Sequence, residues 1–413
     1  MSEGKIGLMD IILLRTISLL CVAVLVALVA RRFQLPYTVG LVVAGIVLAV
    51  ARLQTGAMLT HEFIFDLILP PLLFDAALSL HWKELRRDLL PILALSTFGV
   101  AISALVVTGC MMYFLDWPLA PALIFSVLIA ATDPVSVIAM FKDVGIKGRL
   151  RLLVESESLF NDGVAAVLFS LTLLWMQSGD QAAPAMGNVA QILGLMAGGG
   201  LFVGSICGAA ALLLIGRTAD HLVETTVTAV TAYGAFLIAE HFHFSGVLAT
   251  VAAGLILGNL GVLSESDDNP LSSNGRMFVV AFWDFAAFIV NSLVFLLIGL
   301  AVAGIAFHSV GLMALLSTIA FVLLGRALTV YPLCLLFGRS RWAIPMKERH
   351  VLWWGGLRGA LALALALALP ANLDHRDDIL IFAFAVVVFS VVMQGLTMPW
   401  LLRKLGFLSS TSR

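Results

Sequence analysis

The sequence consists mainly of long apolar stretches separated by short polar segments. A helix needs about 20 predominantly apolar residues to cross the hydrocarbon core of a bilayer. By this measure we predict thirteen transmembrane helices, with these limits: 8–30, 36–51, 62–80, 89–114, 119–141, 151–176, 188–216, 221–241, 244–262, 276–305, 309–337, 350–370 and 378–402. The pattern therefore predicts an all-α polytopic membrane protein with about 13 transmembrane helices.

The composition supports this fold class. Of the 413 residues, 61% are hydrophobic and 12% are charged, whereas soluble domains contain about 25% charged residues. The mean hydropathy is +1.06. A soluble fold cannot bury this much apolar surface, so membrane lipid is the expected surrounding medium. The balanced net charge of −1 argues against a nucleic-acid partner.

The basic residues predict the orientation. Thirteen spans place the termini on opposite sides of the membrane, and basic residues prefer cytoplasmic loops. With the N-terminus outside and the C-terminus cytoplasmic, 18 basic residues lie in inner loops and 3 in outer loops. The other three, Arg15, Arg326 and Arg358, lie within spans. We expect this orientation, with one membrane transporter domain over residues 1–413 and a short cytoplasmic tail at 403–413.

Two halves of six spans are predicted to be inverted repeats: residues 8–176, a linker helix at 188–216, and residues 221–402. In each half the fifth span is interrupted. The first interruption is Thr132-Asp133-Pro134, and the second is the glycine cluster at 355–359. Proline removes a backbone donor and glycine weakens a helix. Interrupted crossing helices at matching places in inverted halves indicate a transporter's binding site. The alternative is a pair of kinks that face lipid.

The sixth span carries a polar group at membrane depth, where ionisable residues are costly and usually functional. Ser158 and Asp162 are four residues apart, as are Glu157 and Asn161, so each pair shares a helix face. Oxygen ligands of this kind suit a hard cation. Asp162 is the deepest carboxylate, and it can hold either a proton or a cation. The alternative is a polar cluster in a re-entrant or interfacial turn.

Other charges are predicted to support this group. We expect Asp133 to face helix N-termini, which stabilise a carboxylate, and Thr132 to offer a freed backbone carbonyl. Arg358 stays charged and needs an anion, for which Glu157 is the candidate. The partner of Arg326 is not identifiable from the sequence.

Three further polar residues lie in predicted spans. Asp75 either lines the access route or is satisfied by solvent near the cytoplasmic end of its span. Asp284 and Asn291 are seven residues apart on one helix face, and we interpret them as helix-packing groups.

Five ordered motifs together resemble the cation:proton antiporter family, which includes bacterial NhaP-type sodium/proton antiporters and animal sodium/proton exchangers. The motifs are Leu69-Pro70-Pro71 with Asp75, residues 131–135 (ATDPV), 157–162 (ESLFND), Phe282-Trp283, and 355–360 (GGLRGA). The resemblance covers nearly the whole chain. Many bacterial members carry Glu where this chain has Asp75.

The resemblance implies thirteen helices, arranged as a core domain and a dimerisation domain that slide past each other. It also implies that Asp162 carries the ion or the proton, that Ser158 and the Thr132 backbone complete the Na⁺ ligands, and that Glu157 pairs with Arg358. The Asn161-Asp162 pair is similar to the electroneutral branch. A homodimer in the bacterial inner membrane is the expected assembly and location.

The sequence therefore predicts a secondary antiporter, not an enzyme, that exchanges Na⁺ for H⁺ without a cofactor. Because Asp162 is the only carboxylate expected to alternate, we expect electroneutral 1:1 exchange. Li⁺ and K⁺ remain open as substrates. The alternative function is a cation channel, which would need a continuous pore.

Overall fold

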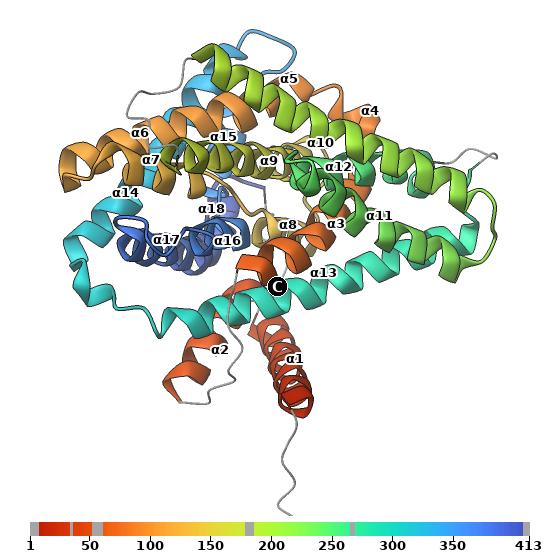
Figure 1. The fold of residues 1–413 in the computed structure, drawn as a ribbon, viewed down its shortest axis with the longest axis horizontal. Helices are drawn as coiled ribbons and strands as arrows, with labels where there is room; N and C mark the ends of the chain where they lie inside the picture. Colours follow the sequence, from red (N-terminus) through yellow and green to blue (C-terminus); the bar gives the residue numbers. More distant parts are fainter. Residues whose placement is uncertain (1–7, 34–35, 52–60, 178–185, 265–268, 408–413) are drawn as a thin grey trace, which may run out of the picture.

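The computed structural model describes residues 8–33, 36–51, 61–177, 186–264 and 269–407. Over these residues the chain is helical and contains no strand. Each predicted span coincides with a helix or with consecutive helical segments, so the predicted fold class is confirmed (Figure 1). Seven of the described helical stretches, two of which contain a π-helical turn, are long and apolar enough to cross a membrane. The other predicted spans contain shorter or interrupted helices.

The helices pack most closely within two groups. We call the first the frame. It contains α1 (Leu8–Phe33), α2 (Tyr37–Val50), η1 (Phe63–Ile68), α3 (Leu69–Ser79), α11 (His221–His241), α12 (Gly246–Leu257), η3 (Gly258–Val262) and α13 (Ser273–Val302). The helix α10 (Met186–Ile215) packs along α11 and α12 and also touches α9 of the other group.

We call the second group the core bundle. It contains α4 (Trp82–Leu85), α5 (Leu89–Leu93), η2 (Ala94–Phe98), α6 (Gly99–Leu115), α7 (Leu119–Leu128), α8 (Val135–Val144), α9 (Arg149–Gln177), α14 (Leu312–Leu336), α15 (Met346–Trp354), α16 (Ala360–Leu367), α17 (Arg376–Phe389), η5 (Ser390–Gln394) and α18 (Gly395–Lys404). The short helix η4 (Phe307–Ser309) precedes α14. In Figure 1, α6, α14 and α17 lie to the left of α11 and α12. Each group thus takes three predicted spans from each half of the sequence.

Close backbone contact holds the frame together. Gly45 of α2 and Gly299 of α13 face each other, and a β-carbon on either residue would overlap the backbone of the opposite helix. Small residues at helix crossings allow this approach, which maximises van der Waals packing in lipid. The crossing therefore fixes α2 against the long helix α13.

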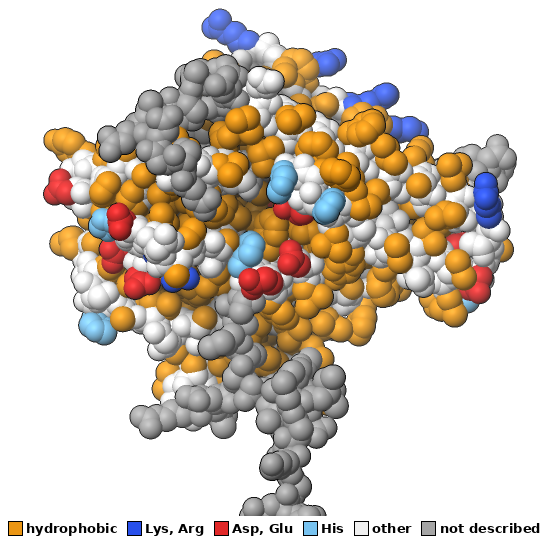
Figure 2. All heavy atoms as spheres, in the orientation of Figure 1, with side chains coloured by type: hydrophobic (Ala, Val, Ile, Leu, Met, Phe, Trp, Pro, Cys, Tyr) orange, Lys and Arg blue, Asp and Glu red, His pale blue; other side chains and the backbone are white. Residues whose placement is uncertain are grey.

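Hydrophobic side chains cover much of the outer surface, and Lys and Arg gather at its edges (Figure 2). Exposed apolar residues are stable in a hydrocarbon medium, whereas a soluble protein rarely presents large apolar patches. The alternating Ala and Leu residues at 360–367, within the predicted span 350–370, form α16. The chain is therefore a multi-pass membrane protein.

Short π-helical turns, which the sequence does not predict, interrupt several spans, as at η2 and η5. The predicted cytoplasmic tail also begins inside a helix, because Arg403 and Lys404 belong to α18. Residues 408–413 lie outside the described part of the chain.

Candidate functional site

Two helix interruptions meet inside the core bundle. The first separates α7 from α8 at residues 129–134, and the second separates α15 from α16 at residues 355–359. The backbone N–H of Asp133 donates a hydrogen bond of 2.7 Å to the carbonyl of Leu357, which joins the two segments directly. The predicted interruptions are therefore present, and they lie side by side.

Each interruption supplies a charge that satisfies the other. The Nη1 atom of Arg358 donates to the carbonyls of Ala130 at 2.5 Å and Ala131 at 3.1 Å, just beyond the C-terminal end of α7. Helix C-termini carry partial negative charge, so a cation is favourable there. We call this contact the arginine cap.

Asp133 acts in the opposite sense. Its Oδ1 atom accepts a hydrogen bond of 2.9 Å from the N–H of Val135, the first residue of α8. It also interacts with the backbone N–H of Ala360, where α16 begins. A β-carbon on Gly359 would overlap the carboxylate, so only glycine permits this approach. Asp133 thus lies at two helix N-termini, where an anion is favourable. We call this contact the aspartate cap.

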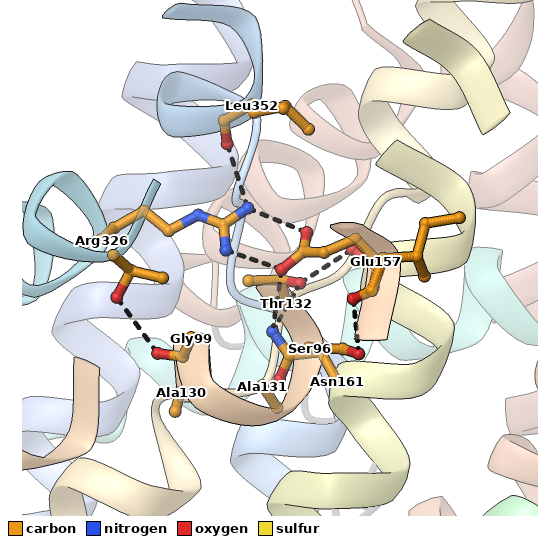
Figure 3. Close-up of polar contacts among 12 residues, drawn as sticks. Ser96, Gly99, Ala130, Ala131, Thr132, Glu157, Asn161, Arg326 and Leu352 are labelled. Atoms are coloured by element: carbon orange, nitrogen blue, oxygen red, sulfur yellow. Dashed lines mark hydrogen bonds and ion pairs between the residues drawn. The ribbon is translucent and has the colours of Figure 1, made fainter. Parts of the chain in front are cut away.

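A polar face of α9 lies against the first interruption (Figure 3). The hydroxyls of Thr132 and Ser158 are 2.8 Å apart. The Nδ2 atom of Asn161 donates to Thr132 Oγ1 at 3.3 Å and to Glu157 Oε1 at 3.4 Å. Apart from the partly buried Asp162, every predicted polar residue of this face is buried. The structure therefore brings Thr132, Ser158, Asn161 and Glu157 into one hydrogen-bonded cluster.

The predicted ion pair between Glu157 and Arg358 is wrong. Glu157 instead pairs with Arg326 of α14, whose Nη1 and Nη2 atoms donate to Oε1 at 2.7 Å and Oε2 at 2.9 Å (Figure 3). Arg326 Nη2 also donates to the carbonyl of Leu352 at 3.1 Å. Both partners are buried, at 5% and 2% exposure. This bidentate geometry is the strong form of an arginine–carboxylate contact. It also identifies the partner of Arg326 that the sequence left open.

Asp162 is the carboxylate of the cluster that has acceptor capacity left. Its Oδ1 atom is buried and has no hydrogen-bond partner in the described part of the chain, and the same holds for Oδ1 of Asn161. The charges that act on Asp162 come from Asp133, Glu157 and Arg358. Buried acceptors without a partner are costly unless a ligand or proton satisfies them. Both oxygens could therefore accept a ligand, and the carboxylate of Asp162 could also accept a proton.

Asp75 lies apart from this cluster. The side chain, on α3 of the frame, is partly buried, and within the described residues no hydrogen bond joins it to Thr132, Ser158 or Asp162. The charges near it belong to Asp284, Lys142 and Glu155. Asp284 is exposed, so its interpretation as a helix-packing group is wrong. The shorter acid at position 75 thus stands among other charges of the frame and core bundle.

Sequence reasoning missed Arg326 as the partner of Glu157, although its presence within a span was a signal. The side chain of Arg15, the third arginine within a span, lies outside the described part. The histidines, cysteines and acids that the structure describes form no group of three or more suited to a resident metal ion. The donor set of the site is therefore hydroxyl, amide and carboxylate oxygen.

Comparisons with known proteins agree with this architecture. A family model described as "Sodium/hydrogen exchanger, transmembrane" matches residues 18–404. The chain is 42% identical to the Na⁺/H⁺ antiporter ApNhaP of Aphanothece halophytica, over 92% of this chain and 71% of that protein. It is 35% identical to the Na⁺/H⁺ antiporter NhaH of Halobacillus aidingensis, over 96% of this chain and 98% of that protein.

The fold is also similar to a solved structure. The sodium proton antiporter MjNhaP1 from Methanocaldococcus jannaschii aligns with a TM-score of 0.78 at 21% identity, covering 98% of this chain and 100% of that one. At this identity the likeness concerns the fold alone.

Proposed function

The chain belongs to the transmembrane sodium/hydrogen exchanger family, and from this premise we propose that it exchanges Na⁺ for H⁺ by alternating access. One observation carries the proposal at the level of atoms. Among the described residues, a buried oxygen of Asp162 has no hydrogen-bond partner, and the charges that act on Asp162 include Asp133 and Arg358, one from each helix interruption. Interrupted helices in transporters expose backbone and helix ends to a bound ion. The relatives that match this chain are named Na⁺/H⁺ antiporters, which favours exchange over a channel.

We propose that Asp162 binds either Na⁺ or H⁺. Ser158, Thr132 and Asn161 would complete the Na⁺ ligands, because hard cations prefer oxygen. Ser158 lies one helical turn before Asp162 on α9, and Thr132 contacts both Ser158 and Asn161. The free Oδ1 of Asn161 supports its inclusion. Na⁺ is the first choice of substrate, and Li⁺ and K⁺ are to be tested beside it.

We propose that exchange is electroneutral, one cation for one proton. The charge count at the site supports this. Two buried cations, Arg326 and Arg358, are balanced by two carboxylates, Glu157 and Asp133. Asp162 is the fifth charge, and a bound Na⁺ or H⁺ neutralises it equally. Each crossing of the site then moves the same net charge.

Asp75 would act on the access route to the site. The charges that act on it belong to Asp284, Lys142 and Glu155, of which Asp284 is exposed, and this supports an electrostatic role for it. No second proton at Asp75 is needed for the proposed stoichiometry.

The proposed assembly, membrane and partners follow from the antiporter function. We propose a homodimer in a bacterial inner membrane, with the N-terminus outside and the C-terminus in the cytoplasm, as the distribution of basic residues favours. Membrane lipid, Na⁺ and H⁺ are its partners. We propose no enzymatic activity, no cofactor and no nucleic-acid partner.

Purified protein in liposomes tests the function. A preset pH gradient should collapse when Na⁺ is added, with saturation in Na⁺, and a panel of Li⁺ and K⁺ would rank the substrates. Exchange that saturates and follows the pH gradient would support the proposal. Unsaturable cation flux that is independent of the pH gradient would indicate a channel instead.

A further inference from the structure

A small cavity lies where α14 packs against the second interruption and the junction of α17 with η5. It offers about 10 Å³ to the centre of a water-sized molecule. Most of its lining is apolar, but four residues contribute polar groups: Arg326, Gly356, Arg358 and Gln394. Two buried arginines therefore line one small cavity.

One of these groups has an unused donor. The Nη1 and Nη2 atoms of Arg326 donate hydrogen bonds to Glu157 and to the carbonyl of Leu352. Its Nε atom is buried and has no hydrogen-bond partner in the part of the chain that the structure describes. The Nε lies against Gly356, which also lines the cavity. A buried charged donor without a partner destabilises the folded protein, so we expect an acceptor beside this atom.

Gln394 offers the matching acceptor. Its Nε2 atom donates to the carbonyl of Trp354 at 3.0 Å, which fixes the amide in the wall of the cavity. Among the described residues, no hydrogen bond reaches its amide oxygen. Gln394 is 3% exposed, so the residue is almost entirely buried. The residues that carry this donor and this acceptor thus line the same cavity, and no hydrogen bond joins them in the described part of the chain.

We propose that this cavity binds one ordered water molecule, which accepts from Arg326 Nε and donates to the amide oxygen of Gln394. A buried site holds a water when it has room for about 10–15 Å³ and two to four polar partners, and the 10 Å³ available here admits one molecule. The site lies on the side of Arg326 opposite to Glu157. The water completes the hydrogen bonds of the arginine whose other face neutralises that carboxylate.

Gln394 is therefore a positioning residue that acts through the water on Arg326. This consequence rests on the proposed exchange at Asp162, on which Glu157 acts electrostatically. If Arg326 is held less firmly, it neutralises Glu157 less well, and the added negative charge makes Asp162 bind a proton more tightly. Because Na⁺ carries the same charge and gains as well, the effect on proton binding is to be measured at limiting Na⁺. The acid limb of the exchange activity should then move to higher pH.

Variants test this coupling. Gln394→Met keeps the volume but removes the acceptor, together with the Nε2 donor to the carbonyl of Trp354. Arg326→Lys keeps the charge but removes the Nε donor. Each should move the acid limb to higher pH, by about half a unit for Gln394→Met, since nearby charges shift proton binding on this scale. The double variant should shift no further than Arg326→Lys alone. Additive shifts, or an unchanged profile in Gln394→Met, would overturn the coupling.

A matched control lies one turn away. Thr397 accepts a hydrogen bond of 2.9 Å from the indole of Trp354, the residue whose carbonyl Gln394 contacts, but it does not line the cavity. Thr397→Val should leave the pH profile unchanged. An equal shift in this variant would assign the effect to the anchoring of Trp354 and contradict the water.

The water itself can be observed without transport. A cryo-EM map of the full-length protein in lipid nanodiscs, at a resolution that shows ordered water, should contain density within hydrogen-bond distance of Arg326 Nε and Gln394 Oε1. A map that resolves waters elsewhere in the core bundle but none here would refute the site. Because the map needs no exchange activity, failure of the proposed function would be seen separately.

Discussion

The two helix interruptions perform the same task with opposite chemistry. The first contains an acid and a proline, and the second contains an arginine among glycines. Asp133 of the first satisfies the helix that begins in the second, and Arg358 of the second satisfies the helix that ends in the first. The comparison shows that neither interruption has its unsatisfied backbone groups paired by its own residues alone. The charges at the crossing are thus primarily structural.

The difference in backbone chemistry follows from this exchange. Pro134 precedes the first residue of α8, where a missing N–H costs nothing. Gly359 precedes the first residue of α16, where the Asp133 carboxylate occupies the position of a β-carbon. One interruption therefore requires a residue that fixes the backbone, and the other requires a residue without a side chain.

The largest effect is expected where a charge is not structural. Asp162→Asn keeps the shape of the side chain but removes its charge and its proton. Exchange in liposomes should fall to background while thermal stability stays at or above that of the wild type, because a buried unpaired carboxylate is lost.

Asp133→Asn is the contrasting variant, which should lower thermal stability because it weakens the aspartate cap. Wild-type exchange in Asp162→Asn would end the model of competition for one carboxylate.

The next effect separates the two arginines. Arg326→Ala leaves Glu157 buried without its partner, which typically costs about 3–5 kcal/mol of folding stability. Adding Glu157→Ala should restore part of the loss. Thermal or denaturant unfolding of the single and double variants would measure this recovery.

Arg358 is the control in this double-mutant cycle. The losses in Arg358→Ala and Glu157→Ala should be closer to additive, because Arg358 bonds the carbonyls of the arginine cap and not Glu157. Strong recovery with Arg358 and none with Arg326 would contradict the pairing described above.

A smaller effect tests the fit of the second interruption. Gly359→Ala places a methyl group where the Asp133 carboxylate lies, and it should destabilise the protein by about 1–3 kcal/mol, as overpacking does. Gly234 of α11 is the matched control, since a β-carbon there meets no other atom within 4 Å. Gly234→Ala should be neutral or stabilising by about 1 kcal/mol through helix propensity. Equal melting temperatures for the two variants would argue against the aspartate cap.

The last prediction is that membrane voltage has no effect on the rate of exchange. If the charges at the crossing stay fixed and only Asp162 alternates, voltage should not change the rate of exchange. A membrane potential acts with about 2.3 kcal/mol per charge per 100 mV, so a second moving charge would be readily detected. Exchange in liposomes with a clamped potassium diffusion potential measures this, and a voltage-dependent rate would require another titrating group, for which Asp75 is the first candidate.

The spans and the two interruptions were predictable because they depend on local properties of the chain. Apolar length decides what crosses lipid, and Pro134 and the glycines at 355–359 weaken a helix wherever they occur. The π-helical turns such as η2 depend on packing between helices, and no residue pattern predicts them.

The electrostatic partners were less predictable. Arg326 and Arg358 both lie in spans, and the sequence gives no distance from either to Glu157. The choice is made by tertiary packing, which places α14 beside α9 and turns Arg358 towards Ala130. Asp133, by contrast, was expected at helix N-termini because the chain interruption creates such ends nearby. Its place at Val135 agrees with that expectation.

The reciprocal caps have a consequence for inheritance and for protein engineering. Residues 129–134 and 355–359 are more than 200 positions apart in the sequence, yet each completes the backbone of the other. A chimaera that exchanges only one of these segments with a distant homologue would combine a charge with a helix end that it was not selected to meet. The two segments should therefore be exchanged together and taken from the same homologue, because they form one structural unit from two distant parts of the chain.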